Sequence, residues 1–334
     1  MPTIELKAPY LIFLGDEPRA LLAKTGLGIA HWRPELCVGQ LRLPGCGVDL
    51  GLPDMSPAEA AAAGAKSLIW GVASVGGVIP PSWVGSLIEA AEAGLDIVAG
   101  THGPLAEVPG LANAAERASV SLVDIRTPPK NIDVGTGIKR QGKRLLTIGT
   151  DCCVGKKFTA LALAKEMADR GMNVVFRATG QTGIMIAGGG IPIDAVVSDF
   201  VSGAAEILSP DNDADHWDVI EGQGSLFHPG YAAVTLGLLH GSQPDVFVVC
   251  HEAGRKVVDD YPLFPLPDLD TLIEHTIRCG KLTNPDIRCI GISVNTAALS
   301  DKDREHYLRA TSESTGLPCV DPLVTGVGLL VDQV

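Results

Sequence analysis

A glycine-bounded segment near the middle of the chain limits what this sequence can fold into. Arg144–Ile148 is mostly apolar and is expected to form a strand, and Phe158–Arg170, which ends at Gly171, has helical composition. In a strand–loop–helix unit of this kind, backbone N–H groups and the helix N-terminus point at phosphate oxygens, and a lysine adds a mobile positive charge. The sequence therefore predicts a P-loop for a diphosphate-bearing ligand, although an ordinary turn with a chance Gly-Lys pair is the alternative. The predicted binding residues are Gly149, Thr150, Asp151, Cys152, Cys153, Val154, Gly155, Lys156, Lys157 and Phe158.

Polar residues follow the later predicted strands at the points where those strands end. The expected strands are Asn173–Arg177, Asp218–Ile220, Asp245–Cys250 and Ile290–Val294. Ligands of open parallel sheets bind outside the carboxyl ends of the strands. We therefore expect a site at the edge that carries the phosphate loop. Its candidate residues are Arg177, Thr179, Gln181, Thr182, Glu221, Gln223, Ser225, His228 and Arg255.

The first half of the chain has the same alternation of short apolar runs and helical segments. The runs are Tyr10–Leu14, Leu36–Leu43, Ser67–Ala73, Leu95–Ala99 and Ser119–Ile125, with helices expected at Pro57–Ala65 and Ser82–Ala93. This alternation predicts a parallel doubly wound sheet. The spaced glycine fingerprint of dinucleotide sites is missing, so we expect a scaffold or dimerisation domain that contributes loops.

The chain length and the positions of proline and glycine predict the domain boundaries. A chain of 334 residues favours two domains, and the segment around Pro128-Pro129 separates two apolar-periodic regions. We predict an α/β protein with a Rossmann-like βα domain at 1–127, a linker at 128–142 and a P-loop NTPase-like doubly wound parallel sheet at 143–334.

Charge and cysteine usage restrict the partners and the compartment. A net charge of −13 argues against nucleic acid or an anionic membrane surface, since no broad cationic surface is available. The eight cysteines lack CxxC spacing, which favours free thiols in the cytoplasm. No signal peptide is expected, and the uncharged stretch Ser67–Ile88 is interpreted as a strand, a turn at Gly76-Gly77 and a helix start.

The loop GTDCCVGKK, together with VIEGQGS after a later strand and GISVN near the end, resembles dethiobiotin synthetase and its P-loop relatives. The sequence departs from that pattern at Lys157, where those enzymes carry the hydroxyl residue that binds magnesium. A lysine repels a divalent cation, and helical geometry should turn Thr159 away from the ligand. Magnesium-dependent phosphoryl transfer is therefore doubtful, and no metal site is predicted.

Over almost its whole length the chain also resembles the D-glutamate N-acetyltransferase family. The segments GTDCCVGKKFTA, RATGQTG and VIEGQGSL carry this resemblance. It implies acetyl-CoA as the acetyl donor, the α-amino group of D-glutamate as the acceptor, and a homo-oligomer. Coenzyme A suits a phosphate loop with two lysines, and its thioester needs no phosphoryl chemistry.

The chemistry then requires a base, oxyanion donors and cations for the acceptor's carboxylates. Glu221 is the leading base or ammonium anchor, with Asp199, Asp194 and His228 as rivals. Gly222–Ser225 N–H groups or the Gln223 amide suit the oxyanion, and Arg177 and Arg255 suit the carboxylates.

Each assignment has a structural alternative. Glu221 could cap a loop, His228 could lie in a turn, Arg255 could be a surface residue, and Asp199 could lie on the surface of a helix over Asp194–Leu208. Cys152 and Cys153 are expected to fill the loop rather than to carry an acetyl group.

Two other functions stay open from the sequence. One is an ATP- and magnesium-dependent, carboxylate-activating enzyme of the dethiobiotin synthetase kind. The other is a nucleotide-binding regulator without enzyme activity, which would use its N-terminal domain for partner contacts.

Overall fold

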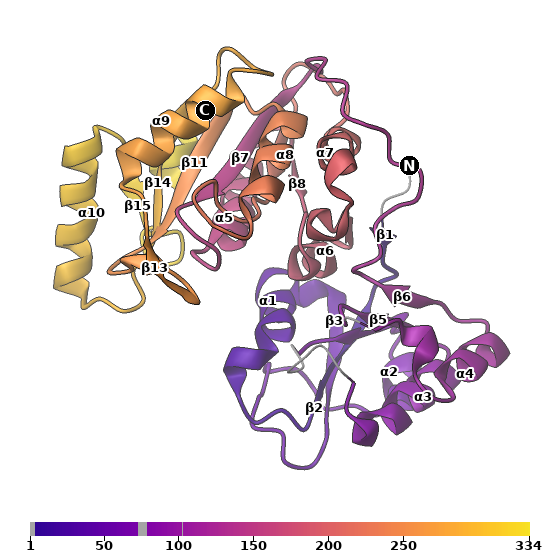
Figure 1. Ribbon diagram of the computed structural model, residues 1–334. Coiled ribbons are helices and arrows are strands. Elements are labelled where there is room, and N and C mark those ends of the chain that lie inside the picture. The colour runs from indigo at the N-terminus through magenta and orange to yellow at the C-terminus, as the bar shows by residue number, and fades with distance from the viewer. Residues whose placement is uncertain (1–3, 73–78, 102) are drawn as a thin grey trace. The chain divides into compact units, whose positions relative to one another are not determined.

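The structure, a computed structural model, describes residues 4–72, 79–101 and 103–334. The chain forms two compact units (Figure 1). The N-terminal unit contains the residues up to 129 together with 181–195, and the P-loop unit contains 130–180 and 196–334. The division differs from the predicted domains, because 181–195 leave the second domain and most of the predicted linker joins the P-loop unit.

The N-terminal unit is built on a five-stranded parallel sheet with the strand order β3-β2-β4-β5-β6. In chain order this is 2-1-3-4-5, a doubly wound arrangement, so the predicted Rossmann-like α/β class is confirmed. Its elements are β1 (Ile4–Glu5), β2 (Tyr10–Gly15), α1 (Lys24–Trp32), β3 (Cys37–Arg42), α2 (Pro57–Ala62), β4 (Ser67–Trp70), α3 (Val84–Glu92), β5 (Asp96–Ala99), α4 (Leu111–Ala118), β6 (Leu122–Asp124), α6 (Gln181–Ala187) and β9 (Gly189–Gly190).

Side-chain and backbone contacts hold residues 181–195 on the N-terminal unit. The hydroxyls of Thr182 and Thr25 lie 3.0 Å apart. Strand β9 pairs with β1 through Ile4 and Gly190, and the side chain of Ile186 is buried. These contacts join parts of the chain that are distant in sequence, which is why local sequence patterns did not reveal them.

The P-loop unit contains a six-stranded sheet, all parallel, in the order β15-β14-β11-β7-β10-β8. A core that includes Leu145, Leu163, Val219 and Val248 packs between this sheet and its helices. Its elements are β7 (Lys143–Gly149), α5 (Lys156–Asp169), β8 (Val174–Arg177), α7 (Val201–Leu208), β10 (Trp217–Ile220), α8 (Ala232–Ser242), β11 (Val246–Glu252), β12 (Val257–Val258), β13 (Tyr261–Pro265), α9 (Leu269–Gly280), β14 (Arg288–Asn295), α10 (Asp301–Thr315), β15 (Cys319–Val320) and α11 (Gly328–Val331).

The strand order reverses at β7. The chain passes from β7 to β8 and back to β10 on one side, and then crosses to β11 on the other side of β7. Ligands of open α/β sheets bind at such a switch point. The loop that follows β7 is therefore flanked by the ends of β10 and β11.

The segment between the two sheets is bound to the P-loop unit. The Glu206 carboxylate accepts hydrogen bonds from the backbone N–H groups of Thr136 and Gly137. Arg140 donates to the carbonyl of Ser209 at the end of α7. This region is thus ordered against α7 and is not a free linker.

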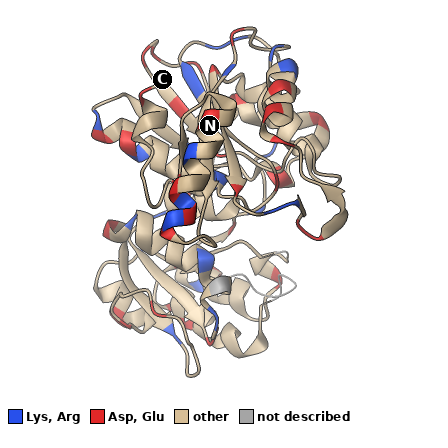
Figure 2. Cartoon of the chain, turned by 90° about the vertical axis from the view of Figure 1, so that its left-hand side faces the viewer, with Lys and Arg blue, Asp and Glu red and all other residues tan. Residues whose placement is uncertain are grey.

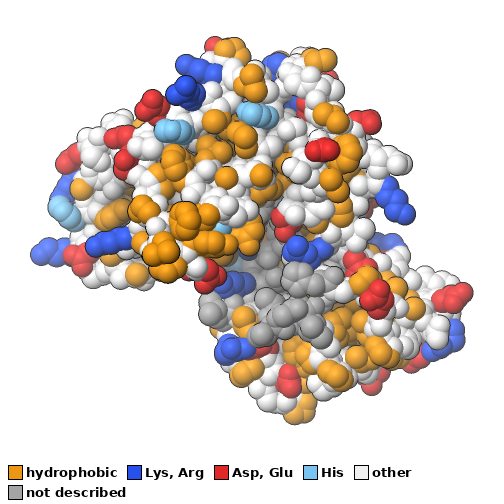
Figure 3. Space-filling view, in the orientation of Figure 1, with side chains coloured by type: hydrophobic (Ala, Val, Ile, Leu, Met, Phe, Trp, Pro, Cys, Tyr) orange, Lys and Arg blue, Asp and Glu red, His pale blue; other side chains and the backbone are white. Residues whose placement is uncertain are grey.

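Apolar side chains are exposed on the antiparallel β12–β13 hairpin. Figure 3 shows hydrophobic side chains gathered over the part of the P-loop unit where Figure 1 draws this hairpin. Leu263 is 89% exposed, and Phe264 and Val257 are also exposed.

The expected turn at Gly76-Gly77 lies outside the described residues. In the described ranges, no helix has the length and apolarity needed to cross a membrane.

Two helical glycines give a matched test of the packing between α7 and the segment that precedes β7. A Cβ on Gly203 would lie 1.8 Å from the carbonyl oxygen of Asp133, whereas a Cβ on Gly85 in α3 would meet no described atom within 4 Å. We expect Gly203→Ala to destabilise the protein by about 1–3 kcal/mol through overpacking. We expect Gly85→Ala to stabilise it by about 0.5–1 kcal/mol through its helix propensity. Thermal unfolding midpoints measure both effects, and an unchanged midpoint for Gly203→Ala would contradict the described packing.

Candidate functional site

The segment between β7 and α5 has the geometry of a phosphate loop. Gly155, which precedes the helix, has φ of 106°, and Cys153 has φ of 58°. A Cβ on Gly149 would lie 2.6 Å from the Asp151 carbonyl oxygen and 2.7 Å from Lys156 Nζ. Glycine is therefore needed at 149 because the loop closes tightly on itself.

The two lysines at the start of α5 have different surroundings. Lys156 is buried, its Nζ donates to the carbonyl oxygen of Asp151 at 2.7 Å, and desolvation lowers its pKa. Lys157 Nζ lies 5.1 Å from the ring centroid of Phe158. As expected, Thr159 faces away from the loop, since its hydroxyl lies 2.8 Å from that of Ser293 in the buried interior.

Asp151 is a fully buried carboxylate inside the loop. Its Oδ2 accepts hydrogen bonds from Arg255 Nη1 at 2.9 Å and from the Asp259 N–H at 2.8 Å, and its Oδ1 accepts from the Cys152 N–H. A buried carboxylate is tolerated when it is paired and hydrogen-bonded in this way. Asp151 therefore joins the phosphate loop to the segment that follows β11.

His228 lies beside Asp151 with its protonation pattern set by the backbone. Its Nδ1 accepts hydrogen bonds from the N–H groups of Gly230 and Tyr231 at 3.0 and 3.1 Å. The neutral ring therefore carries its proton on Nε2, which lies 4.0 Å from Asp151 Oδ1. The geometry suits a hydrogen-bond donor, and it disfavours the predicted role as a general base because the basic lone pair is occupied.

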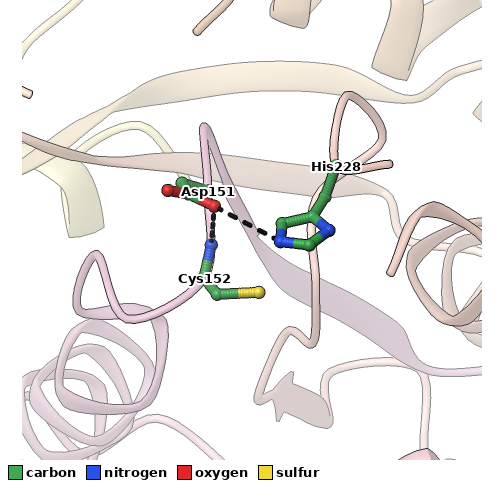
Figure 4. A group of neighbouring side chains, drawn as sticks. All are labelled: Asp151, Cys152 and His228. Atoms are coloured by element: carbon green, nitrogen blue, oxygen red, sulfur yellow. Dashed lines mark hydrogen bonds and ion pairs between the residues drawn. The ribbon is translucent and has the colours of Figure 1, made fainter. Parts of the chain in front are cut away.

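Asp151, Cys152 and His228 offer potential ligand atoms within 4.8 Å of one another (Figure 4). A metal ion would need a thiolate and a free histidine lone pair. Burial instead raises the pKa of the Cys152 thiol, and His228 presents an N–H. Arg255 already neutralises Asp151. This group is therefore poorly suited to a metal ion.

Glu221 follows β10 on the other side of the loop. Its Oε2 accepts hydrogen bonds from the N–H groups of Thr179 and Gly180, both at 3.0 Å. Desolvation raises the pKa of this carboxyl, and the hydrogen bonds and the charges of Lys157 and Lys156 oppose that effect. Among the contacts of the described residues, Oε1 accepts no hydrogen bond.

Two further predicted side chains lie within this network. Gln223 Nε2 donates to the Thr179 hydroxyl at 3.0 Å. The Ser225 hydroxyl donates to the carbonyl oxygen of Thr150 at 3.0 Å. The 221–225 loop thus runs beside the phosphate loop and is hydrogen-bonded to it.

The two predicted arginines already have carboxylate partners. Arg177 Nε donates to Asp218 Oδ1 at 2.6 Å, and Asp218 is buried on the neighbouring strand. Arg255 bridges Asp151 and the half-buried Glu252. Arg255 lies next to the loop, whereas Arg177 is directed back along the sheet, so its predicted contact with substrate finds no support here.

Four predicted residues are not brought to the loop by the contacts of the described chain. Gln181 lies beside Gly100 and Arg126, and Thr182 beside Thr25, all in the N-terminal unit. Asp194 in that unit forms a 3.3 Å ion pair with Arg126.

Asp199 also differs from expectation, since the helix expected over Asp194–Leu208 forms only at Val201–Leu208. Asp199 lies in the exposed turn Ser198–Phe200 that precedes it.

The structure adds His251, which lies near the end of β11 and directly follows the predicted strand Asp245–Cys250. Its Nδ1 lies 3.0 Å from the hydroxyl of Thr150 in the phosphate loop.

Figure 2 shows basic residues scattered among acidic ones instead of gathered on one element. An anionic ligand would therefore have to be held by the local donors of the phosphate loop.

Comparison with known proteins gives consistent matches for both units. A family model described as a Rossmann-like domain of unknown function (DUF1611_N) matches residues 41–128, and one described as a P-loop domain of unknown function (DUF1611_C) matches residues 133–331. The D-glutamate N-acetyltransferase of Tritonibacter scottomollicae is 49% identical over 327 residues, which are 98% of each chain. That of a Pseudoalteromonas species is 48% identical over 98% of this chain and 99% of its own. A crystal structure of a DUF1611 family protein from Anabaena variabilis has a TM-score of 0.84 and 32% identity, and the match covers 98% of this chain and 99% of that one.

Replacing Glu221 tests whether its buried negative charge destabilises the folded protein. Burial raises the pKa of the Glu221 carboxyl in the folded protein. The folded state therefore becomes less stable as the pH rises from the carboxyl's pKa in the unfolded chain to its higher pKa in the folded protein, and the loss is complete above the folded value. We expect Glu221→Gln to melt at the same or a higher temperature than the wild type at pH 8, with the gain disappearing toward pH 4. If the variant is clearly less stable than the wild type at pH 8, the attraction of Lys156 and Lys157 for the Glu221 charge exceeds the cost of burying that charge.

Proposed function

The chain belongs to the DUF1611 family and is similar over nearly its whole length to two D-glutamate N-acetyltransferases, and we propose that it transfers the acetyl group of acetyl-CoA to the α-amino group of D-glutamate. The observation that carries this proposal is the buried Glu221 carboxylate beside a phosphate loop that has no magnesium-binding hydroxyl after Lys156. The identity of both relatives over nearly the full chain supports it further.

The donor's phosphates would be bound by the loop without a metal ion. Lys156 and Lys157 provide two positive charges at a helix N-terminus, where anions are favoured. Thr159, the nearest hydroxyl along the helix, is bound to Ser293 and faces the interior. The pyrophosphate of coenzyme A fits this set of donors.

Glu221 is the base in this proposal. The α-ammonium group first releases one proton to solvent, and the resulting amine attacks the thioester carbonyl carbon. The nitrogen then loses a second proton to Glu221, the C–S bond breaks, and the leaving thiolate of coenzyme A takes that proton from the Glu221 carboxyl. A raised pKa brings a carboxylate closer to the basicity that proton transfer needs at neutral pH. The oxyanion would be stabilised by the Nε2–H of His228 or by the Gln223 amide.

The acceptor's carboxylates require a cation near Glu221. Arg255 is the better of the two predicted arginines because its pair with the half-buried Glu252 is open to exchange with a substrate carboxylate. Arg177 is held by a buried aspartate. Leaving that aspartate unpaired would be costly.

Loss of the buried lysine should weaken donor binding. We expect Lys156→Ala to reduce the affinity for acetyl-CoA by about 10–100-fold, because a charged hydrogen bond contributes about 1.5–3 kcal/mol. Isothermal titration with EDTA present measures this affinity. Lys165→Ala is the matched control, since Lys165 pairs with Asp169 on the exposed face of the same helix.

Unchanged affinity in Lys156→Ala would exclude the proposed loop contact. Binding of ATP that requires magnesium, without binding of acetyl-CoA, would instead favour the carboxylate-activating enzyme.

Glu221→Gln should lower kcat for acetyl transfer by about 10²–10⁴-fold, the usual contribution of a general base. Only the deprotonated carboxyl accepts a proton, and burial raises its pKa, so the wild-type kcat/KM should fall on the acid side at a pH above the ordinary glutamate range. Initial rates from pH 4 to 9 measure this limb. Asp199→Asn tests the rival acid in parallel. Loss of activity there with full activity in Glu221→Gln would reverse the assignment.

A further inference from the structure

Two aromatic rings lie at the edge of the P-loop unit that β11, β14 and α10 form. The rings of His251, at the end of β11, and Tyr307, on α10, are 14° from parallel, with their centroids 6.5 Å apart. Both residues are half-buried. Figure 1 shows α10 along β15 and β14, on the side of the sheet that lies away from β8. The pair thus offers partly exposed aromatic rings for stacking.

This pair of rings begins next to the phosphate loop. His251 Nδ1 lies 3.0 Å from the hydroxyl of Thr150, whose N–H also donates to the Cys250 carbonyl. Burial lowers the pKa of His251 and so favours the uncharged form of its ring. A planar group linked by one sugar to a diphosphate on the loop would therefore reach these rings.

A cation lies on the same face of α10. Arg304 is three residues before Tyr307, which places the two side chains next to each other on the helix. Its Nε donates to the Thr296 hydroxyl at 2.8 Å, and its Nη1 pairs with Asp301, whose side chain is 92% exposed. Exposed ion pairs are weak, so an incoming phosphate can replace Asp301.

We propose that this corner, which consists of His251, Tyr307 and Arg304, binds the adenosine end of the acetyl donor. The purine stacks on the His251–Tyr307 rings and the 3′-phosphate is bound by Arg304, while the pyrophosphate lies on the loop. The inference rests on the proposed function, since it assumes that acetyl-CoA is the donor. None of the three residues takes part in the proposed chemistry at Glu221.

The test compares two donors that carry the same thioester. Acetyl-CoA has the adenosine end, and acetyl-pantetheine lacks it. Tyr307→Ala should raise KM for acetyl-CoA by about 5–100-fold, the usual range for loss of base stacking, and should leave kcat and the rate with acetyl-pantetheine unchanged. Tyr307→Phe keeps the ring and should behave like the wild type, which separates stacking from the hydroxyl and from folding.

Arg304→Gln gives an independent readout. The wild type should prefer acetyl-CoA over its 3′-dephospho analogue by about 10-fold or more, as expected for one charged contact, and the variant should lose this preference. An unchanged KM for acetyl-CoA in Tyr307→Ala, or an equal loss with acetyl-pantetheine, would overturn the inference and leave the proposed function intact. A wild type that transfers acetyl from neither donor would overturn both.

Discussion

The site depends on a carboxylate buried inside an anion-binding loop. Asp151 would repel a phosphate and would be costly to bury if its charge were not compensated. Arg255 and the N–H groups of Cys152 and Asp259 provide that compensation. The consequence is mechanical as well as electrostatic, because the loop after β7 becomes fixed to the chain that follows β11. The phosphate loop, the β12–β13 hairpin and His228 are thus held around one charge.

The sequence was informative where function depends on local backbone geometry. Gly149, Gly155 and Lys156 lie in a strand–loop–helix unit whose spacing is set by covalent geometry, so the pattern alone predicted the loop. Strand ends were also predictable, since apolar runs end where the sheet ends. Glu221 therefore lies at the edge that the loop occupies, as parallel topology requires.

The sequence-based prediction of the site was incomplete where contacts between distant parts of the chain determine the position of a side chain. Gln181 and Thr182 directly follow Gly180, which binds Glu221, yet their partners are Gly100, Arg126 and Thr25 of the N-terminal unit. The position of Arg177 at a strand end predicted a contact with substrate. In the structure, the register of β8 against β10 brings Arg177 to Asp218 instead. His251 and Tyr307 come together only because the fold places helix α10 beside the end of β11, although the two elements are far apart in the sequence. No local pattern contains that information.

The charge around the loop is a physical reason for proposing a thioester donor instead of a nucleoside triphosphate. A triphosphate needs a divalent cation to spread the charge of its transition state, and Lys157 occupies the position from which a hydroxyl would hold that cation. A thioester is already activated, so its phosphates need only be bound and oriented. In the proposed reaction the chemical step falls to Glu221, where burial raises the pKa and backbone N–H groups hold one oxygen. In the same proposed reaction Glu221 at the end of β10 acts on the acceptor, and the chain around the end of β11 contributes to both ligands, through Arg255 to the acceptor and through His251 to the donor.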